Sequence, residues 1–526
     1  MLIVENVGLT FGKRVLFENV NLKFENDNCY GIIGANGAGK TTFLKILSGE
    51  IESTKGEVIV GKDERVSVLV QNHNAYDDYT VIDTVIMGDK ELYDIKTEKE
   101  ALYMKEDFTN EDGIRAGILE DLFLKHNGWE AEANAAILLA GLGVKTELHN
   151  QFMRDIKESD KVKVMLARAL FGDPDILLLD EPTNGLDLDS KEWLEEFLIN
   201  FKNTVIVISH DRYFLNKVCT HMVDIDYNKI TLFTGNYDFW YESSKLIQQQ
   251  MRDSNKKKEE RIKELQEFIR RFSANASKSK QATSRKKTLE KIVLDEIKPS
   301  SRRYPFINFE IERTLGKEVI YLNKITKPGI LSNVRFTIKP GDKIILLGNN
   351  EIAKTALLNI LAGVDTEFEG EMKVGTTVTT AYYPKNYDPF FETNDNMVEW
   401  LRNFSDNKDE TFIRSFLGRM LFSGEESLKS VNVLSGGEKV RCMLSKMMLA
   451  RSNVLLFDEP TNHLDMESIT ALADGMLNFK GSIVFSSYDQ HLIENVANRV
   501  IKINDDGTII DTELNYEEFV KKYGKN

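Results

Sequence analysis

A segment of eight residues occurs twice in this chain, which indicates an internal duplication. The first copy is Asp180-Glu181-Pro182-Thr183-Asn184-Gly185-Leu186-Asp187, and 278 residues later the chain reads Asp458-Glu459-Pro460-Thr461-Asn462-His463-Leu464-Asp465. Each copy follows a short apolar run, at 176–179 or 454–457, which predicts a buried parallel strand. The 526 residues are enough for two or three domains of ordinary size. We therefore expect two related α/β domains.

A glycine-rich loop in the first half predicts a site for a phosphate group. The loop is Gly34-Ala35-Asn36-Gly37-Ala38-Gly39-Lys40-Thr41, between an apolar run at 29–33 and a helical pattern at 42–47. In this context the backbone N–H groups surround a triphosphate at a helix N-terminus. The candidate nucleotide-binding residues are Gly34, Ala35, Asn36, Gly37, Ala38, Gly39, Lys40, Thr41 and Thr42.

Four side chains near this loop have the chemistry needed to hydrolyse ATP. Lys40 is expected to reach the β- and γ-phosphates, while Thr41 and Asp180 are expected to hold Mg²⁺. Glu181 is the natural general base for the attacking water. The sequence thus predicts an ATPase that uses ATP and Mg²⁺.

The second half carries an altered copy of the same loop, Gly348-Asn349-Asn350-Glu351-Ile352-Ala353-Lys354-Thr355. Glu351 brings a negative charge next to a triphosphate, and Ala353 adds a methyl group where the backbone must turn tightly. Lys354 and Thr355 are retained as candidate nucleotide-binding residues. We expect this site to be close to inactive, although weak ATP binding stays open.

These motifs resemble the ABC ATPase superfamily. The resemblance implies that Phe11 stacks on adenine, that Gln71 senses Mg²⁺ and the attacking water, and that His210 contacts the γ-phosphate. Gln71 and His210 thereby join Glu181 as candidate catalytic residues, and Gln71 joins the candidate Mg²⁺ ligands. The matching positions of the second half hold Ile325, Lys385 and Tyr488.

A further ABC motif is intact only in the second half. It reads Leu434-Ser435-Gly436-Gly437-Glu438 there, against Ile156-Lys157-Glu158-Ser159-Asp160 in the first half. The resemblance implies head-to-tail packing, in which Ser435, Gly436 and Gly437 cap the ATP held by Lys40. The altered phosphate loop of the second half and the altered motif of the first half then face each other across the same composite site. We expect one hydrolytic site and one structural or regulatory site, with degenerative drift as the alternative.

The segment between the halves is basic although the chain carries a net charge of −15. Residues 242–300 hold 16 Lys and Arg against 9 Asp and Glu, and an apolar stripe predicts a helical hairpin over 241–305. A solvated tether is the alternative. The candidate RNA contacts at its tip are Arg270, Arg271, Lys278, Lys280, Arg285, Lys286 and Lys287.

The first half also contains an acidic insert at about 88–128. Residues 89–121 carry 11 acidic and 5 basic side chains. Such a segment should avoid phosphate and could meet a basic protein surface, and a plain solvated helix pair is the alternative. We place the first ABC domain at 1–240, the linker at 241–305 and a second, degenerate ABC domain at 306–526.

Two ABC domains joined by a charged hairpin resemble the ABC-F family. The fold class implied is α/β, with two P-loop domains that carry helical subdomains. The resemblance implies a monomeric, cytoplasmic ATPase that binds the tRNA exit site of the ribosome when ATP is bound. The linker would then meet rRNA and the peptidyl-site tRNA, and the insert would meet a stalk protein.

Three other functions stay open at this point. The first is ribosome protection against antibiotics within the same family, although the turn between the linker helices looks short for that role. The second is the ATPase subunit of a transporter, and the third is a chromosome- or repair-type ATPase. No apolar run of 18 residues and no secretory signal is visible, so we expect no transmembrane helix and a cytoplasmic location. The linker hairpin and the fused duplication speak against a separate membrane subunit, so none is expected.

Overall fold

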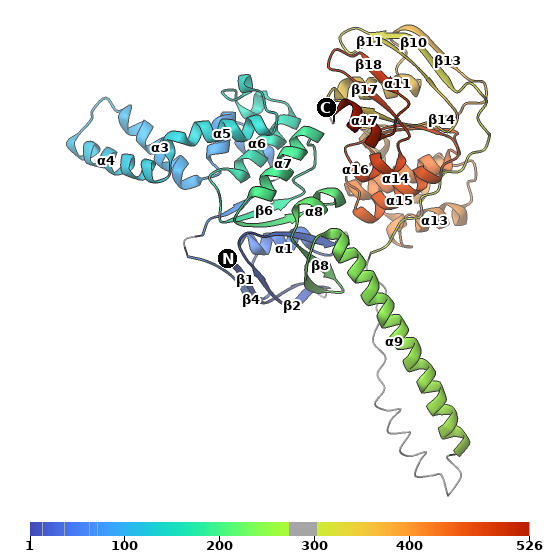
Figure 1. Cartoon of the computed structure of the whole chain (residues 1–526), viewed down its shortest axis with the longest axis horizontal. Helices are drawn as coiled ribbons and strands as arrows, with labels where there is room; N and C mark the ends of the chain where they lie inside the picture. The colour runs from blue at the N-terminus through green and yellow to red at the C-terminus, as the bar shows by residue number, and fades with distance from the viewer. Residues whose placement is uncertain (13, 36, 63, 71, 273–301, 525–526) are drawn as a thin grey trace.

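The computed structural model describes residues 1–272 and 302–524, except positions 13, 36, 63 and 71. In this part of the chain two α/β bodies lie side by side, and one long helix extends away from them (Figure 1). The N-terminus lies in the first body and the C-terminus in the second. Each half of the chain thus has its own sheets, as the duplication predicts.

The first half contains an antiparallel sheet of order β2-β1-β4 and a six-stranded sheet of order β5-β6-β7-β3-β8-β9. In the larger sheet β5, β6, β7, β3 and β8 run parallel, and β9 is antiparallel. Strands β3, β6 and β7 are buried along their whole length, as parallel strands covered on both faces are. The strands are β1 (Leu2–Phe11), β2 (Arg14–Phe24), β3 (Cys29–Gly34), β4 (Lys55–Val60), β5 (Val66–Val68), β6 (Ile176–Asp180), β7 (Thr204–Ile208), β8 (His221–Asp226) and β9 (Lys229–Thr234).

The helices of the first half divide into two groups. Helices α1, α7 and α8 each follow a strand of the large sheet, β3, β6 and β7 in turn, whereas α2 to α6 form a helical region inserted between β5 and β6. The helices are α1 (Lys40–Leu47), α2 (Val81–Ile86), α3 (Lys90–Tyr103), α4 (Asn110–Lys125), α5 (Ala131–Gly141), α6 (Glu158–Leu170), α7 (Leu188–Asn200) and α8 (Arg212–Val218).

The second half repeats this topology strand for strand. Its sheets have the orders β11-β10-β13 and β14-β15-β16-β12-β17-β18. The strands are β10 (Ile320–Lys327), β11 (Leu331–Ile338), β12 (Lys343–Leu347), β13 (Glu369–Val374), β14 (Thr380–Tyr383), β15 (Val454–Asp458), β16 (Ser482–Ser486), β17 (Arg499–Ile503) and β18 (Ile509–Thr512). The helices are α11 (Glu351–Leu361), α12 (Met397–Asn403), α13 (Glu410–Arg419), α14 (Gly436–Leu449), α15 (Met466–Asn478), α16 (Gln490–Val496) and α17 (Tyr516–Tyr523).

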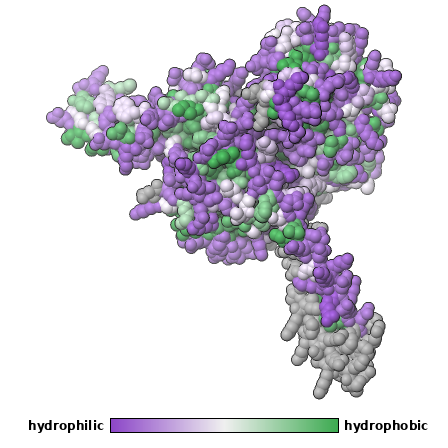
Figure 2. All heavy atoms as spheres, viewed as in Figure 1, coloured by the Kyte–Doolittle hydropathy of each residue, from purple (hydrophilic) through white to green (hydrophobic). Residues whose placement is uncertain are grey.

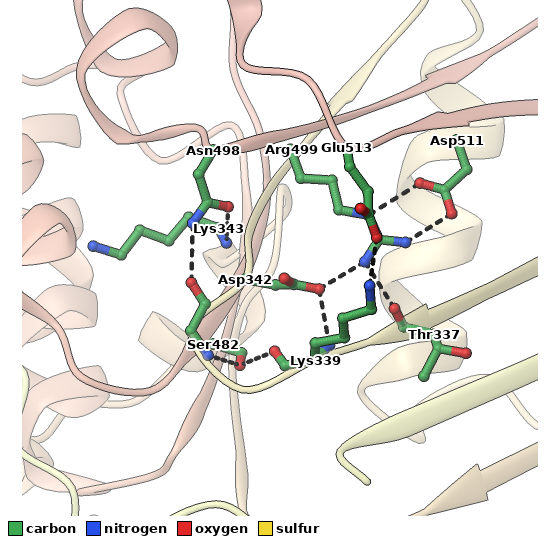
Figure 3. A network of polar contacts seen from close by, with 10 residues as sticks. Thr337, Lys339, Asp342, Lys343, Ser482, Asn498, Arg499, Asp511 and Glu513 are labelled. Atoms are coloured by element: carbon green, nitrogen blue, oxygen red, sulfur yellow. Dashed lines mark hydrogen bonds and ion pairs between the residues drawn. The ribbon is translucent and has the colours of Figure 1, made fainter. Parts of the chain in front are cut away.

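A polar network fixes one end of the second sheet (Figure 3). The buried guanidinium of Arg499 donates to Asp342 at 2.6 Å and to Asp511 at 2.7 Å. Nearby, the Ser482 hydroxyl donates to the carbonyl of Lys339 at 2.8 Å. These bonds join the starts of β12, β16 and β17 to β18. They therefore anchor the strand whose other end leads into the second phosphate loop.

The linker begins with helix α9 (Tyr237–Phe272), which projects from the two bodies (Figure 1). This helix covers the first part of the segment predicted as a helical hairpin over 241–305 and begins four residues before it, while the hairpin itself stays a prediction. Arg270 and Arg271 lie in the last turn of α9. The second linker helix expected at 288–293 lies outside the described residues, and so do the candidate RNA contacts Lys278, Lys280, Arg285, Lys286 and Lys287.

The acidic insert folds as a pair of helices, α3 and α4, that forms an arm at the edge of the first half (Figure 1). Apolar side chains emerge among the charges, and green patches are visible on this arm in Figure 2. Met104 is 82% exposed and Ile114 is 69% exposed. Among the described residues, no helix combines the length and the apolar character needed to cross a membrane.

Arg302, near the end of the predicted linker, joins the two halves. Its guanidinium lies 2.6 Å from Asp224 and 3.7 Å from Asp226, both in β8 of the first half. The same group lies 3.2 Å from Glu467 in α15 of the second half. It also lies over the ring of Trp240 at 4.7 Å from the centroid. The last part of the predicted linker is thus tied to both halves.

Candidate nucleotide sites

The first phosphate loop leaves a helix N-terminus open for an anion. Helix α1 begins at Lys40, and its N-cap Gly39 has φ of 101° and makes no side-chain cap hydrogen bond among the described atoms. Only glycine adopts this conformation without strain. The buried Lys40 ammonium donates to the carbonyl of Gly34 at 2.8 Å. The N–H groups of the first helical turn and the lysine thus converge as a phosphate site requires.

Asp180 and Glu181 stand at the carboxyl end of β6, directly beside this loop. The Thr41 hydroxyl donates to the Asp180 carboxylate, and burial raises the pKa of that carboxyl. A hydroxyl oxygen and a carboxylate oxygen in contact are the ligands that Mg²⁺ prefers next to substrate phosphates. The residues present therefore fit the predicted metal. Glu181 itself has φ of 52°, a left-handed conformation that costs about 1–3 kcal/mol in a non-glycine residue.

Glu181 and His210 form a partly buried pair next to Lys40. The His210 Nε2 lies 3.4 Å from Glu181 Oε1, and the His210 backbone N–H donates to Glu181 Oε2 at 3.1 Å. Burial, with Asp180 nearby, raises the pKa of Glu181 to about 8. Burial and the Lys40 charge lower the pKa of His210 to about 4. Glu181 Oε1 and His210 Nδ1 are buried without a hydrogen bond among the described atoms. Such orphaned polar atoms are typical of a site that receives a ligand.

The second phosphate loop has a different backbone. Helix α11 begins at Glu351, so the residues that match the glycines of the first loop form an additional helical turn before Lys354. Its N-cap is Asn350, whose side-chain oxygen accepts from the Ala353 N–H at 3.0 Å. Glutamate, isoleucine and alanine favour a helix where glycines favour a loop. In place of the glycine-rich loop that precedes α1, the second half thus has a helix N-terminus that is capped by a side chain.

The three substitutions in the second site contact one another. The Lys385 ammonium donates to Glu351 Oε2 at 2.5 Å, and the Tyr488 hydroxyl donates to Glu351 Oε1 at 3.1 Å. The Lys354 ammonium in turn donates to the Tyr488 hydroxyl at 2.9 Å. Despite the effect of burial, these partners lower the pKa of Glu351. Thr355 still donates to Asp458 at 2.7 Å, as Thr41 does to Asp180.

The two ABC signature segments differ in how their helices begin. Ser435 starts α14 with a capping box, in which its side chain accepts from the Glu438 N–H and the Glu438 side chain accepts from the Ser435 N–H. Helix α6 instead has Lys157 as its N-cap, without a side-chain cap, and carries Glu158 and Asp160 in its first turn. Carboxylates there interact favourably with the helix dipole and would repel a phosphate.

Besides Arg302, the halves also touch between helix α7 of the first half and the segment that follows β16 in the second. The buried Lys191 donates to Asp211 at 2.6 Å in its own half and to the backbone carbonyl of Tyr488 at 3.1 Å in the other. A cavity of about 80 Å³ between the halves is lined by Glu181 and His210 as well as by residues of the second half. Sequence reasoning missed Lys191, because nothing in its local pattern distinguishes it from a solvated lysine.

Several predicted site residues stand outside what the structure describes. Asn36 and Gln71 are among the positions left out, and the Phe11 side chain is not described although its backbone ends β1. Ser435 is exposed, and Gly436 and Gly437 are partly exposed at the start of α14. Their apposition to Lys40 stays a prediction for the nucleotide-bound protein. Thr42 lies in α1 next to Thr41.

Comparison with known proteins identifies the chain's family. A profile of the ABC transporter family matches residues 17–184 and 331–462, and a second ABC transporter profile matches residues 223–309. The ABC transporter ATP-binding protein YkpA of Bacillus subtilis (strain 168) is 58% identical over 527 residues, which cover 99% of this chain and 97% of the relative. The chain belongs to the ABC ATPase superfamily, in its ABC-F branch.

Other ABC relatives match along the whole chain. The probable ATP-binding protein YbiT of Escherichia coli O157:H7 is 42% identical over 529 residues, which cover all of both chains. The probable ATP-binding protein YheS of Escherichia coli (strain K12) is 30% identical over 96% of this chain and 79% of its own. The prediction of an ATPase with two ATP-binding domains is therefore confirmed.

Solved structures confirm the fold. The RNase-L Inhibitor has a TM-score of 0.64 at 18% identity and covers 98% of this chain and 93% of its own. The archaeal ribosome recycling factor aABCE1, crystallised with the archaeal ribosomal stalk protein aP1, has a TM-score of 0.62 at 18% identity, with 98% and 92% covered. The α/β class with two P-loop ABC domains in tandem is as predicted.

Proposed function

We propose that this ABC-F protein is a cytoplasmic, ribosome-associated ATPase that binds the tRNA exit site with ATP bound and modulates translation. The observation that carries the proposal is the asymmetry of the sites: one open phosphate loop beside Glu181 and His210, and one loop closed into a helix. The likeness to a recycling factor crystallised with a ribosomal stalk protein supports the ribosome as partner. The basic linker supports contact with RNA, and the acidic arm with its apolar side chains supports contact with a stalk protein.

The first site performs the chemistry in this proposal. Lys40 and the N–H groups of the first turn of α1 bind and orient the terminal phosphates. Mg²⁺ held by Thr41 and Asp180 would neutralise charge on the phosphoryl oxygens. The Glu181 carboxylate takes the proton of the attacking water, and the neutral His210 donates toward the γ-phosphate. Ser435 of the other half closes the site, and hydrolysis releases that contact.

Ribosome co-sedimentation tests this function directly. With ATP present, Glu181→Gln should remain on ribosomes, because the closed form can no longer hydrolyse its nucleotide. The matched variant Glu459→Gln should co-sediment no more than the unaltered protein does. ADP in place of ATP should release both. If neither variant binds ribosomes, the ribosome proposal is wrong; if only the double variant is trapped, the second site hydrolyses ATP too.

The pH dependence of ATP hydrolysis should reflect Glu181. Since the pKa of Glu181 is raised to about 8 by burial, its carboxyl is protonated below that pH and cannot act as a base. We expect kcat/KM to fall about tenfold per pH unit as the pH drops below about 8. The pKa of His210, at about 4, leaves that ring neutral across this range. Steady-state phosphate release measured at a series of pH values checks this, and a flat profile through neutral pH would contradict it.

A further inference from the structure

We propose that the chain itself satisfies the anion-binding groups of the second phosphate loop: Asn350 and Glu351 accept hydrogen bonds that a nucleotide phosphate would accept, so this site binds no ATP. The inference rests on the proposed function only in taking the first site as the competent one. The inference states more than a loss of activity at the second site. Glu351, Lys385 and Tyr488 form a permanent contact within the protein, so the second site serves as a fixed part of the structure.

The backbone is the first line of support. A phosphate loop binds its ligand with the N–H groups that precede and open a helix. In α11 the additional turn that begins at Glu351 uses that backbone for the helix, and the Asn350 side chain already accepts from the Ala353 N–H at 3.0 Å. Ala353 corresponds to Gly39 of the first loop, whose helix has no such cap among the described atoms. A phosphate oxygen would have to displace a side chain that belongs to the fold.

The charges give the second line of support. Glu351 accepts from Lys385 at 2.5 Å and from Tyr488 at 3.1 Å, and Tyr488 accepts from Lys354 at 2.9 Å. Glu351 therefore engages Lys385 and the Tyr488 hydroxyl directly, and that hydroxyl in turn accepts from Lys354, so the donors that could bind a γ-phosphate already have partners within the chain. A carboxylate and a phosphate oxygen carry the same sign and accept the same donors. ATP would have to compete with a partner that is covalently tethered and thus present at high effective concentration.

The position of Tyr488 gives this arrangement a consequence for the first site. Its backbone carbonyl accepts from Lys191, and Lys191 also holds Asp211, the residue next to His210. Because the second site neither binds nor releases a nucleotide, nothing at that site breaks this contact during the hydrolysis cycle. The halves would then open at the first site around a fixed contact at Lys191 and Tyr488. One ATP per cycle would suffice to drive the movement.

The experiment counts bound nucleotide. In the Glu181→Gln background, which keeps ATP intact, equilibrium dialysis with radiolabelled ATP and Mg²⁺ should give about one ATP per chain. Adding Glu351→Gly, Ile352→Ala and Ala353→Gly restores the residues of the first loop at these positions. This triple variant should bind about two ATP per chain, because its loop and its cations become free for a phosphate. Ile352→Ala alone is the matched control, since Ile352 is 64% exposed and lies in the same turn.

The outcomes separate the inference from the proposed function. Two ATP per chain in the background protein would overturn it, as would a folded triple variant that binds no more than the Ile352→Ala control. Should the triple variant fail to fold, Glu351→Gly alone takes its place, and its stoichiometry must exceed that of the control. The dialysis contains no ribosomes, so failure to bind ribosomes leaves the result untouched. A background protein that binds no ATP would instead count against the proposed function.

Discussion

Replacing Glu181 with glutamine should lower steady-state ATP turnover by at least about 100-fold, because a general base contributes about 10²–10⁴-fold to a rate. The same replacement at Glu459 should leave turnover within about twofold of the unaltered protein, since the second site does not contribute. Phosphate release at saturating ATP measures both. The two variants form a matched pair, because each removes one titratable carboxyl group and keeps the shape of the side chain.

The local geometry around the two glutamates makes this comparison informative. Both have φ of 52°, and burial raises both pKa values, to about 8 for Glu181 and about 7 for Glu459. The two glutamates are therefore alike, and the difference between the sites lies in their phosphate loops. Equal losses in the two variants would show that the helical start of α11 still admits ATP, and would contradict the single-site view.

Replacing Arg302 with leucine should destabilise the protein by about 3–5 kcal/mol, the usual cost of leaving buried charges without their partner. Asp224, Asp226 and Glu467 would remain close together, and burial already raises the pKa of Asp224 and of Glu467. We expect a lower midpoint of thermal unfolding and faster proteolysis at the linker. Both follow because the contact between β8 and α15 loses its shared cation.

Arg303→Leu is the control for this substitution. Arg303 is the next residue, is exposed, and has the same side chain. Its replacement should leave the free energy of unfolding within about 1 kcal/mol of that of the unaltered protein, as surface substitutions usually do. If Arg302→Leu and Arg303→Leu behave alike, the cluster around Arg302 does not join the halves, and the linker is held in some other way.

The sequence determined the architecture and the first site because both are encoded by neighbouring residues. A strand, a glycine-rich loop and a helix follow one another within residues 29–47, and the observed β3 and α1 lie there as predicted. The apolar runs before Asp180 and Asp458 are the predicted buried strands β6 and β15. Such elements depend on local spacing of apolar and glycine residues, which a single sequence displays.

Only the tertiary structure shows that the altered residues of the second half contact one another. From the sequence, Glu351, Lys385 and Tyr488 are three separate losses, 34 and 103 residues apart along the chain. They follow β12, β14 and β16, whose carboxyl ends meet at one edge because the sheet has the order β14-β15-β16-β12. The strand order brings them within hydrogen-bonding distance. Lys191 and Arg302 depend in the same way on how the halves pack, which residues close in sequence do not specify.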